Sequence, residues 1–205
     1  MITEWAASTK SWLIMSWAFL TLGIAAGSWW AYRELGWGGY WFWDPVENAS
    51  LMPWLAATAL LHSNIVLKKR ASLAGWVALL SILTFGLSLI GTFLVRSGAI
   101  TSVHSFASDP ARGTYILAYI ALAIGGGLWL YAACAGRLTD TVPLTPASRE
   151  GAIVINNIFL ITACATVLLG TLYPMGAELL SGAKITVGAP YFNRVVLPLL
   201  AVPLF

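Results

Sequence analysis

Tryptophan is concentrated in one short part of the chain. Six of the eleven tryptophans lie between Trp29 and Trp54, around the segment WGGYWFWDPVEN at residues 37–48. An aromatic belt at the membrane surface explains a Trp or Tyr at each end of a hydrophobic span. It does not explain so dense a group of indoles on a Gly-Gly backbone. The segment looks like a flat surface for a large planar ligand, and haem is the obvious candidate.

His62 is one of two side chains that could ligate the iron of such a ligand. It lies about fourteen residues into an apolar stretch, or roughly 21 Å from the outer end of a helix, and therefore at membrane depth. An ionisable side chain there is costly and by default functional. The alternative is a hydrogen bond to a neighbouring helix. At helical spacing His62 shares a face with Trp54, Leu55 and Thr58, which would give an iron ligand apolar walls.

His104 is the other histidine, and it lies in a more polar segment between two apolar stretches. An ordinary exposed loop histidine is the alternative, because such residues gather on loop surfaces. The expected topology places His104 on the same side of the membrane as the tryptophan segment, one helical hairpin away. His104 is therefore the second candidate ligand of haem iron.

Two aspartates invite an acid–base interpretation but also fit helix starts. In Asp44-Pro45-Val46-Glu47, an N-cap residue is followed by Pro at the first helical position and Glu at the third. Asp109 before Pro110 has the same form. We favour capping for both. Asp44 is kept as a candidate haem contact because it adjoins the tryptophans.

The remaining reactive residues form no known catalytic pattern. Cys134 and Cys164 lie in separate apolar stretches without a Cys-x-x-Cys motif, and we expect both to be small apolar residues at helix contacts. No phosphate-binding loop and no Ser/His/Asp arrangement is present in the sequence. No catalytic residue is assigned.

Composition defines the class of protein. With 59% hydrophobic and 9% charged residues and a positive mean hydropathy, the charges could not cover the surface of a soluble domain. We expect an all-α, polytopic transmembrane bundle that forms one domain over residues 1–205. We also expect a sixth span to begin near Val195 and the natural chain to continue beyond Phe205. Each of five apolar stretches is near the ~20 residues that cross a bilayer: Ser11–Tyr32, Asn48–Leu67, Leu73–Val95, Thr114–Ala135 and Ala152–Pro174.

Orientation follows from the basic cluster Lys68-Lys69-Arg70, the densest in the chain. The positive-inside rule places this short connection in the cytoplasm. Alternation then places three segments outside: the loop Arg33–Glu47, which belongs to the tryptophan segment (33–54), the His104 loop (96–113) and the segment Met175–Arg194. The basic residues sit at span ends rather than in one stripe, so the net charge of +3 gives no indication of nucleic-acid binding.

These residues resemble a known family. Residues 37–54 are similar to the tryptophan-rich "WWD" signature of haem-handling membrane proteins of cytochrome c biogenesis. A haem exporter of that superfamily shares this signature but not the segments downstream of it, which resemble component F of the multi-subunit cytochrome c maturation system, the haem lyase. The resemblance runs from Trp12 to Phe205 and is carried by PVENAS (45–50), LLHS (60–63), GTFLVRSG (91–98), SVH (102–104) and GTLYP (170–174).

The resemblance implies a role for each candidate residue. His62 matches an axial ligand of a resident b-type haem, and His104 matches a ligand of the haem delivered by a chaperone. Trp37, Trp41, Trp43 and Asp44 match the haem-contacting segment. The family has four such histidines and this chain has two, so the second ligand of each iron would lie before Met1 or after Phe205.

The resemblance also implies an enzyme, a haem lyase subunit that promotes thioether attachment of haem to apocytochrome c. The resident haem would be the reductant, with quinol as a candidate electron source. The implied partners are the haem chaperone (component E), component H, apocytochrome c and the lipid bilayer. The implied location is the bacterial inner membrane, with the tryptophan segment on the periplasmic side; an organellar inner membrane is the alternative.

Two other functions remain open on the sequence. One is a haem transporter or channel without ligation activity, although such sites sit between repeats near the midplane and the sequence has no internal repeat. The other is an assembly scaffold, in which His62 would be a helix-packing residue.

Overall fold

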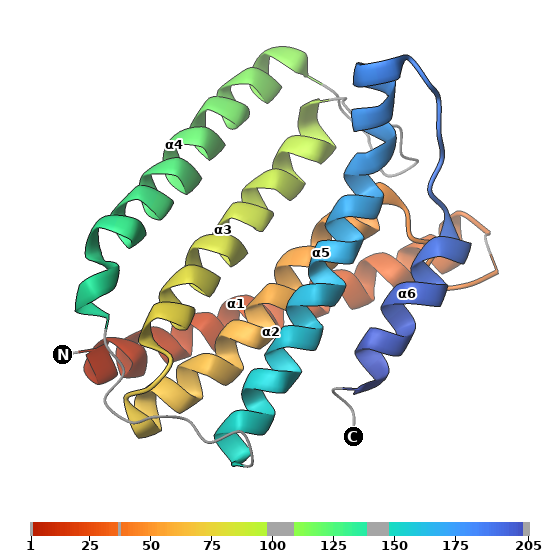
Figure 1. Cartoon of the computed structure of the whole chain (residues 1–205). Coiled ribbons are helices and arrows are strands. Elements are labelled where there is room, and N and C mark those ends of the chain that lie inside the picture. Colours follow the sequence, from red (N-terminus) through yellow and green to blue (C-terminus); the bar gives the residue numbers. More distant parts are fainter. Residues whose placement is uncertain (1, 37, 98–108, 139–147, 203–205) are drawn as a thin grey trace.

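The computed structural model describes residues 2–36, 38–97, 109–138 and 148–202, and over these ranges the chain is helical without strands. Figure 1 shows long helices lying side by side. Five helices are long and apolar enough to span a membrane, which confirms the predicted all-α bundle. The helices are α1 (Ile2–Glu34), α2 (Pro45–Arg70), α3 (Ala74–Ser97), α4 (Pro110–Cys134) with the short 3-10 turn η1 (Ala135–Arg137), α5 (Arg149–Ser181) and α6 (Ala189–Ala201).

Several helices extend beyond the predicted spans. The predicted apolar stretch Ala152–Pro174 lies within α5, which continues to Ser181 and ends where Gly182 takes a left-handed backbone (φ 66°). Proline is tolerated inside transmembrane helices. The sixth helix was expected near Val195 but begins at Ala189, with proline in its first turn.

The central helix of the bundle is α2, which packs against α1, α3 and α5. In turn α4 packs on α3, and α6 packs on α5 (Figure 1). Met52, Leu55 and Leu67 of α2 are fully buried between these neighbours. A helix that is buried on several sides can hold functional side chains away from lipid, and α2 carries both Trp54 and His62.

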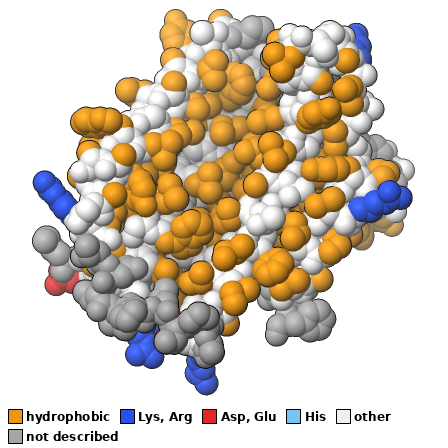
Figure 2. Space-filling view, in the orientation of Figure 1, with side chains coloured by type: hydrophobic (Ala, Val, Ile, Leu, Met, Phe, Trp, Pro, Cys, Tyr) orange, Lys and Arg blue, Asp and Glu red, His pale blue; other side chains and the backbone are white. Residues whose placement is uncertain are grey.

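The outer helices expose apolar side chains. Trp12 and Phe19 on α1 and Leu122 and Trp129 on α4 are each about 70% exposed (72%, 69%, 74% and 69%). Figure 2 shows hydrophobic side chains over most of one face, with basic side chains at its margins. This distribution suits a surface in contact with hydrocarbon.

One end of the bundle is marked by an ion pair between α2 and α5. Arg70 Nε lies 2.9 Å from Glu150 Oε1, and Arg70 is largely exposed. The contact places the basic residues 68–70 beside the start of α5, as the predicted alternation of spans requires. The loop of the tryptophan segment, between Glu34 and Pro45, connects α1 to α2 at the opposite end of α2.

Candidate functional site

The tryptophan segment is anchored to the start of α2 by a capping box. The Asp44 carboxylate accepts a 2.9 Å hydrogen bond from the backbone N–H of Val46. Glu47 Oε2 accepts from the backbone N–H groups of Phe42 (2.9 Å) and Asp44 (3.1 Å). The helix start predicted from Asp44-Pro45-Val46-Glu47 is thus confirmed. The Asp44 side chain caps the helix N-terminus. Together, the hydrogen bonds of Asp44 and Glu47 fix the backbone from which the indoles emerge.

Trp43 connects this helix start to two other helices. The residue is 7% exposed, and its ring stacks on Phe192 of α6, with the centroids 4.9 Å apart. Its Nε1–H donates a 2.7 Å hydrogen bond to Asn193 Oδ1. The Trp43 carbonyl accepts from Asn48 Nδ2, which also donates to Thr171 Oγ1 of α5. Trp43 is therefore a packed anchor between α2, α5 and α6.

The backbone of Trp43 is in the left-handed region, with φ 59°. For a bulky residue this conformation costs about 1–3 kcal/mol and persists only where surrounding contacts impose it. The contacts with Phe192, Asn193 and Asn48 are those constraints. The left-handed turn directs the indole toward α6, immediately before the helical residues of α2 begin.

Trp41 is oriented differently. It is half-buried, and its ring meets that of Trp43 at 89° with the centroids 6.0 Å apart. The two indoles therefore form a corner, and the flat shared surface suggested by their spacing is not what the structure shows. A planar ligand could lie against one ring face while the other ring meets its edge.

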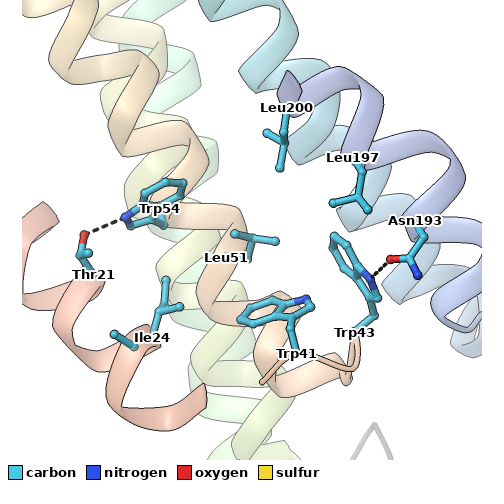
Figure 3. A pocket seen from close by; sticks show the side chains of 10 residues that line it. Thr21, Ile24, Trp41, Trp43, Leu51, Trp54, Asn193, Leu197 and Leu200 are labelled. Atoms are coloured by element: carbon cyan, nitrogen blue, oxygen red, sulfur yellow. Dashed lines mark hydrogen bonds between the residues drawn. The ribbon is translucent and has the colours of Figure 1, made fainter. Parts of the chain in front are cut away.

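A partly open cavity of about 470 Å³ lies at this corner. Its size is within the ~300–1,000 Å³ range of small-molecule sites. Figure 3 shows Trp41, Trp43 and Trp54 with Leu51 between them, facing α1 on one side and α6 on the other. The cavity is lined by Thr21, Ile24, Ala25, Trp41, Trp43, Leu51, Trp54, Asn193, Leu197 and Leu200.

Two of the indole N–H groups of this lining are engaged in hydrogen bonds within the protein. Trp54 Nε1 donates to Thr21 Oγ1 (2.8 Å), as Trp43 does to Asn193 (Figure 3). On the same helix pair, Trp17 Nε1 donates to Thr58 Oγ1 (2.9 Å). Since these indole N–H groups are bound to protein, the cavity offers mainly ring faces and aliphatic carbon. Such a lining favours a large apolar ligand over a polar one.

His62 lies deeper in the bundle and does not line this cavity. It is eight residues beyond Trp54 on α2, which corresponds to about 12 Å along the helix. The ring is half-buried, and its Nδ1 is a buried atom without a hydrogen-bond partner in the described part of the chain. Its polar neighbour is Asn157 of α5. An imidazole at membrane depth, with Nδ1 buried inside the protein, fits an axial haem ligand.

Two predicted site residues, Trp37 and His104, lie outside the described residues. Two others that shape the cavity were not predicted from sequence, Phe192 and Asn193 of α6. The available signal was an asparagine near the start of an apolar helix, since a polar side chain in such a helix usually has a partner. The sequence did not reveal that the partner would be Trp43.

The comparisons with known proteins identify relatives of this chain. The family model described as cytochrome C assembly protein matches residues 1–101. The chain is 61% identical over 197 residues to the cytochrome c-type biogenesis protein CycK of Bradyrhizobium diazoefficiens and 56% identical over 197 residues to CcmF of Pseudomonas aeruginosa. In both cases the alignment covers 96% of this chain and 30% of the relative.

A solved structure has the same fold. The structure described as "Cytochrome c Heme Lyase CcmF" superimposes with a TM-score of 0.78 at 36% identity, covering 100% of this chain and 29% of that one. The chain thus spans about 30% of the length of the relatives it matches. By sequence and by fold, the chain belongs to the CcmF family of cytochrome c-type biogenesis proteins.

Proposed function

We propose that this chain forms the haem-holding part of a cytochrome c haem lyase that acts within a multi-subunit complex. The observation that carries the proposal is the apolar cavity walled by Trp41, Trp43 and Trp54 in a chain of the CcmF family. Its lining suits a porphyrin, because the indoles offer ring faces while the N–H groups of Trp43 and Trp54 are bound to protein.

The reaction is the addition of two cysteine thiols of an apocytochrome Cys-x-x-Cys-His motif to the two vinyl groups of haem. Each addition forms one C–S bond and transfers the thiol hydrogen to the other vinyl carbon, so the step has no net redox change. The protein would contribute position rather than acid–base groups. The corner between Trp41 and Trp43 would hold the porphyrin while its vinyl edge faces the apocytochrome.

Each of the two histidines would ligate the iron of a different haem. His104 would ligate the iron of the delivered haem, on the same side as the tryptophan segment. His62 would ligate a resident b-type haem within the membrane, which would supply the electron that keeps the delivered iron reduced. Residues outside this chain would provide the second ligand of each iron, and quinol is the proposed source of electrons.

The proposed setting is the bacterial inner membrane, with the tryptophan segment on the periplasmic side. The basic residues at the opposite end of α2 support this orientation through the positive-inside rule. The proposed partners are the haem chaperone (component E), component H and apocytochrome c. The 33–54 and 96–113 segments would be the parts that meet them.

Two substitutions test this proposal, made in the protein purified from membranes with its co-assembling subunits. His62→Ala should remove the Soret and α bands of the resident b haem and leave capture of chaperone-bound haem largely intact. His104→Ala should block formation of holocytochrome c and leave the resident haem spectrum normal.

The opposite results would overturn the assignments. Wild-type amounts of low-spin b haem in His62→Ala would exclude His62 as its ligand, and a wild-type yield of holocytochrome c would exclude His104. Loss of both signals in the His104→Ala variant would indicate misfolding. Added imidazole then separates the cases, because it can replace an absent axial ligand but cannot restore a collapsed segment.

A further inference from the structure

We infer that Asn157 is a positioning residue for His62: its Oδ1 accepts a hydrogen bond from Nδ1–H of the imidazole and thereby presents Nε2 to the iron. This inference rests on the proposed function, because it assumes that His62 is a haem ligand. It adds a residue from a different helix, 95 positions along the chain, to the proposed resident haem site.

The first observation is complementarity between two buried atoms. His62 Nδ1 and Asn157 Oδ1 are both buried, and neither has a hydrogen-bond partner among the residues that the structure describes. Asn157 is fully buried, and its side chain is the polar neighbour of the imidazole. A donor and an acceptor left unsatisfied side by side in an apolar bundle would each cost about 1–3 kcal/mol. A hydrogen bond between them removes both penalties.

The second observation fixes the direction of the Asn157 amide. Asn157 Nδ2 donates a 2.7 Å hydrogen bond to Ser63 Oγ, and the Ser63 hydroxyl donates to the Ala59 carbonyl (2.9 Å). Ser63 is therefore an acceptor toward Asn157, which requires the amide nitrogen on that side. With the amide nitrogen directed at Ser63, the carboxamide oxygen is the acceptor that the group offers to the neighbouring His62.

The arrangement has a consequence for the ligand. An iron-bound histidine commonly donates its other N–H to an acceptor that fixes the tautomer and the ring orientation. A neutral amide accepts this hydrogen bond without drawing the proton away as a carboxylate would. The imidazole bound to iron therefore stays a moderate electron donor, which sets a higher midpoint potential than a histidine paired with a carboxylate would have.

Three variants of the protein, purified from membranes with its co-assembling subunits, test the inference. Asn157→Leu keeps a side chain branched at Cγ and removes the acceptor. Asn157→Asp keeps an acceptor and adds charge. Asn156→Ala is the matched control, because Asn156 is the adjacent residue of α5 and also has a buried side-chain oxygen without a partner in the described residues. The readouts are b-haem content, the midpoint potential from a redox titration of the α band, and the low-spin EPR signal.

The expected pattern is opposite shifts for the two Asn157 variants. Asn157→Leu should retain b haem about 10- to 100-fold more weakly and shift its midpoint potential upward. Asn157→Asp should retain the haem and shift the potential downward, with altered EPR g values. Asn156→Ala should match wild type in potential.

Other outcomes overturn the inference. Unchanged potential and haem content in both Asn157 variants would exclude the hydrogen bond. Equal haem loss in Asn157→Leu and Asn157→Asp would show that packing of the amide matters rather than its acceptor. Failure of the proposed function is seen separately, because His62→Ala would then keep its b haem whatever the Asn157 variants show.

Discussion

Trp43 and Asn193 are 150 residues apart in the sequence, yet the indole Nε1–H of Trp43 donates a 2.7 Å hydrogen bond to Asn193 Oδ1. The contact joins the residue before the N-cap of α2 to α6. Because both side chains also line the candidate haem cavity, the shape of this cavity depends on the docking of α6. A change in α6 should therefore alter the position of the Trp43 indole and the shape of the cavity.

The first prediction concerns that hydrogen bond. Asn193→Ala leaves the buried Trp43 N–H without an acceptor, and the free energy of unfolding should fall by about 1–3 kcal/mol. Equilibrium unfolding in detergent, followed by tryptophan fluorescence, measures the loss. In a Trp43→Phe background the same change should have a much smaller effect, since Phe has no N–H to satisfy. An equal loss in both backgrounds would show that the contact does not couple the two residues.

The second prediction separates the roles of the two cavity indoles. Trp41→Ala should weaken haem retention about 2- to 10-fold, because one aromatic contact contributes about 0.5–1.5 kcal/mol beyond buried area. Trp43→Ala should do the same and also lower protein stability, since Trp43 is a packed anchor. The loss should grow when the two changes are combined. Haem titration of the purified protein measures the first effect and thermal unfolding the second.

Trp12→Ala is the control for this series, because Trp12 lies on α1 with 72% of its surface exposed. It should leave haem retention at the wild-type level. Full cytochrome c assembly by the Trp41→Ala/Trp43→Ala double variant would reduce the tryptophan segment to an ordinary membrane belt.

The third prediction concerns the contact between α5 and α6. A Cβ added at Gly170 would lie 2.7 Å from ring carbons of both Tyr191 and Phe192. Phe192 is fully buried, so its ring cannot move aside freely, and overpacking of this kind costs about 1–3 kcal/mol. Gly170→Ala should therefore displace α6, disturb the Trp43–Phe192 stack and weaken haem retention together with stability.

Gly176→Ala is the matched control on α5, where an added Cβ meets nothing within 4 Å. Alanine has a higher helix propensity than glycine, so this change should leave the melting temperature unchanged or raise it slightly. If the two alanine variants have the same melting temperature, the close approach at Gly170 does not hold α6 in place.

Local features of the fold could be predicted from the sequence. The starts of α2 and α4 were readable because a cap involves neighbours in the chain, and Asp44 and Asp109 both accept hydrogen bonds from backbone N–H groups of the first turn. The spans were readable because a bilayer demands about 20 apolar residues. The helix ends could not be predicted from hydropathy, because α1 and α5 continue beyond the apolar stretches into more polar residues.

The candidate site could be predicted only in part. Composition pointed to the tryptophan segment, and depth in a span pointed to His62. The left-handed backbone of Trp43 could not be predicted, because contacts with distant residues impose it. The same reason applies to Asn193 and Asn157, whose partners lie on other helices. Pairings between helices depend on tertiary packing, and a single sequence does not display that packing.

The fourth prediction decides between two roles for Asp44. Its carboxylate accepts from the backbone N–H of Val46, and asparagine caps a helix about as well as aspartate does. Asp44→Asn should therefore retain near wild-type stability, whereas Asp44→Ala should lower the free energy of unfolding by about 0.5–2 kcal/mol. Thermal unfolding of both variants checks the difference. A direct haem contact through the negative charge predicts another pattern, in which Asp44→Asn is as stable as wild type but retains haem as poorly as Asp44→Ala. We expect haem retention to follow stability instead, because the capping box orients the backbone from which Trp41 and Trp43 emerge, and that backbone does not need the charge.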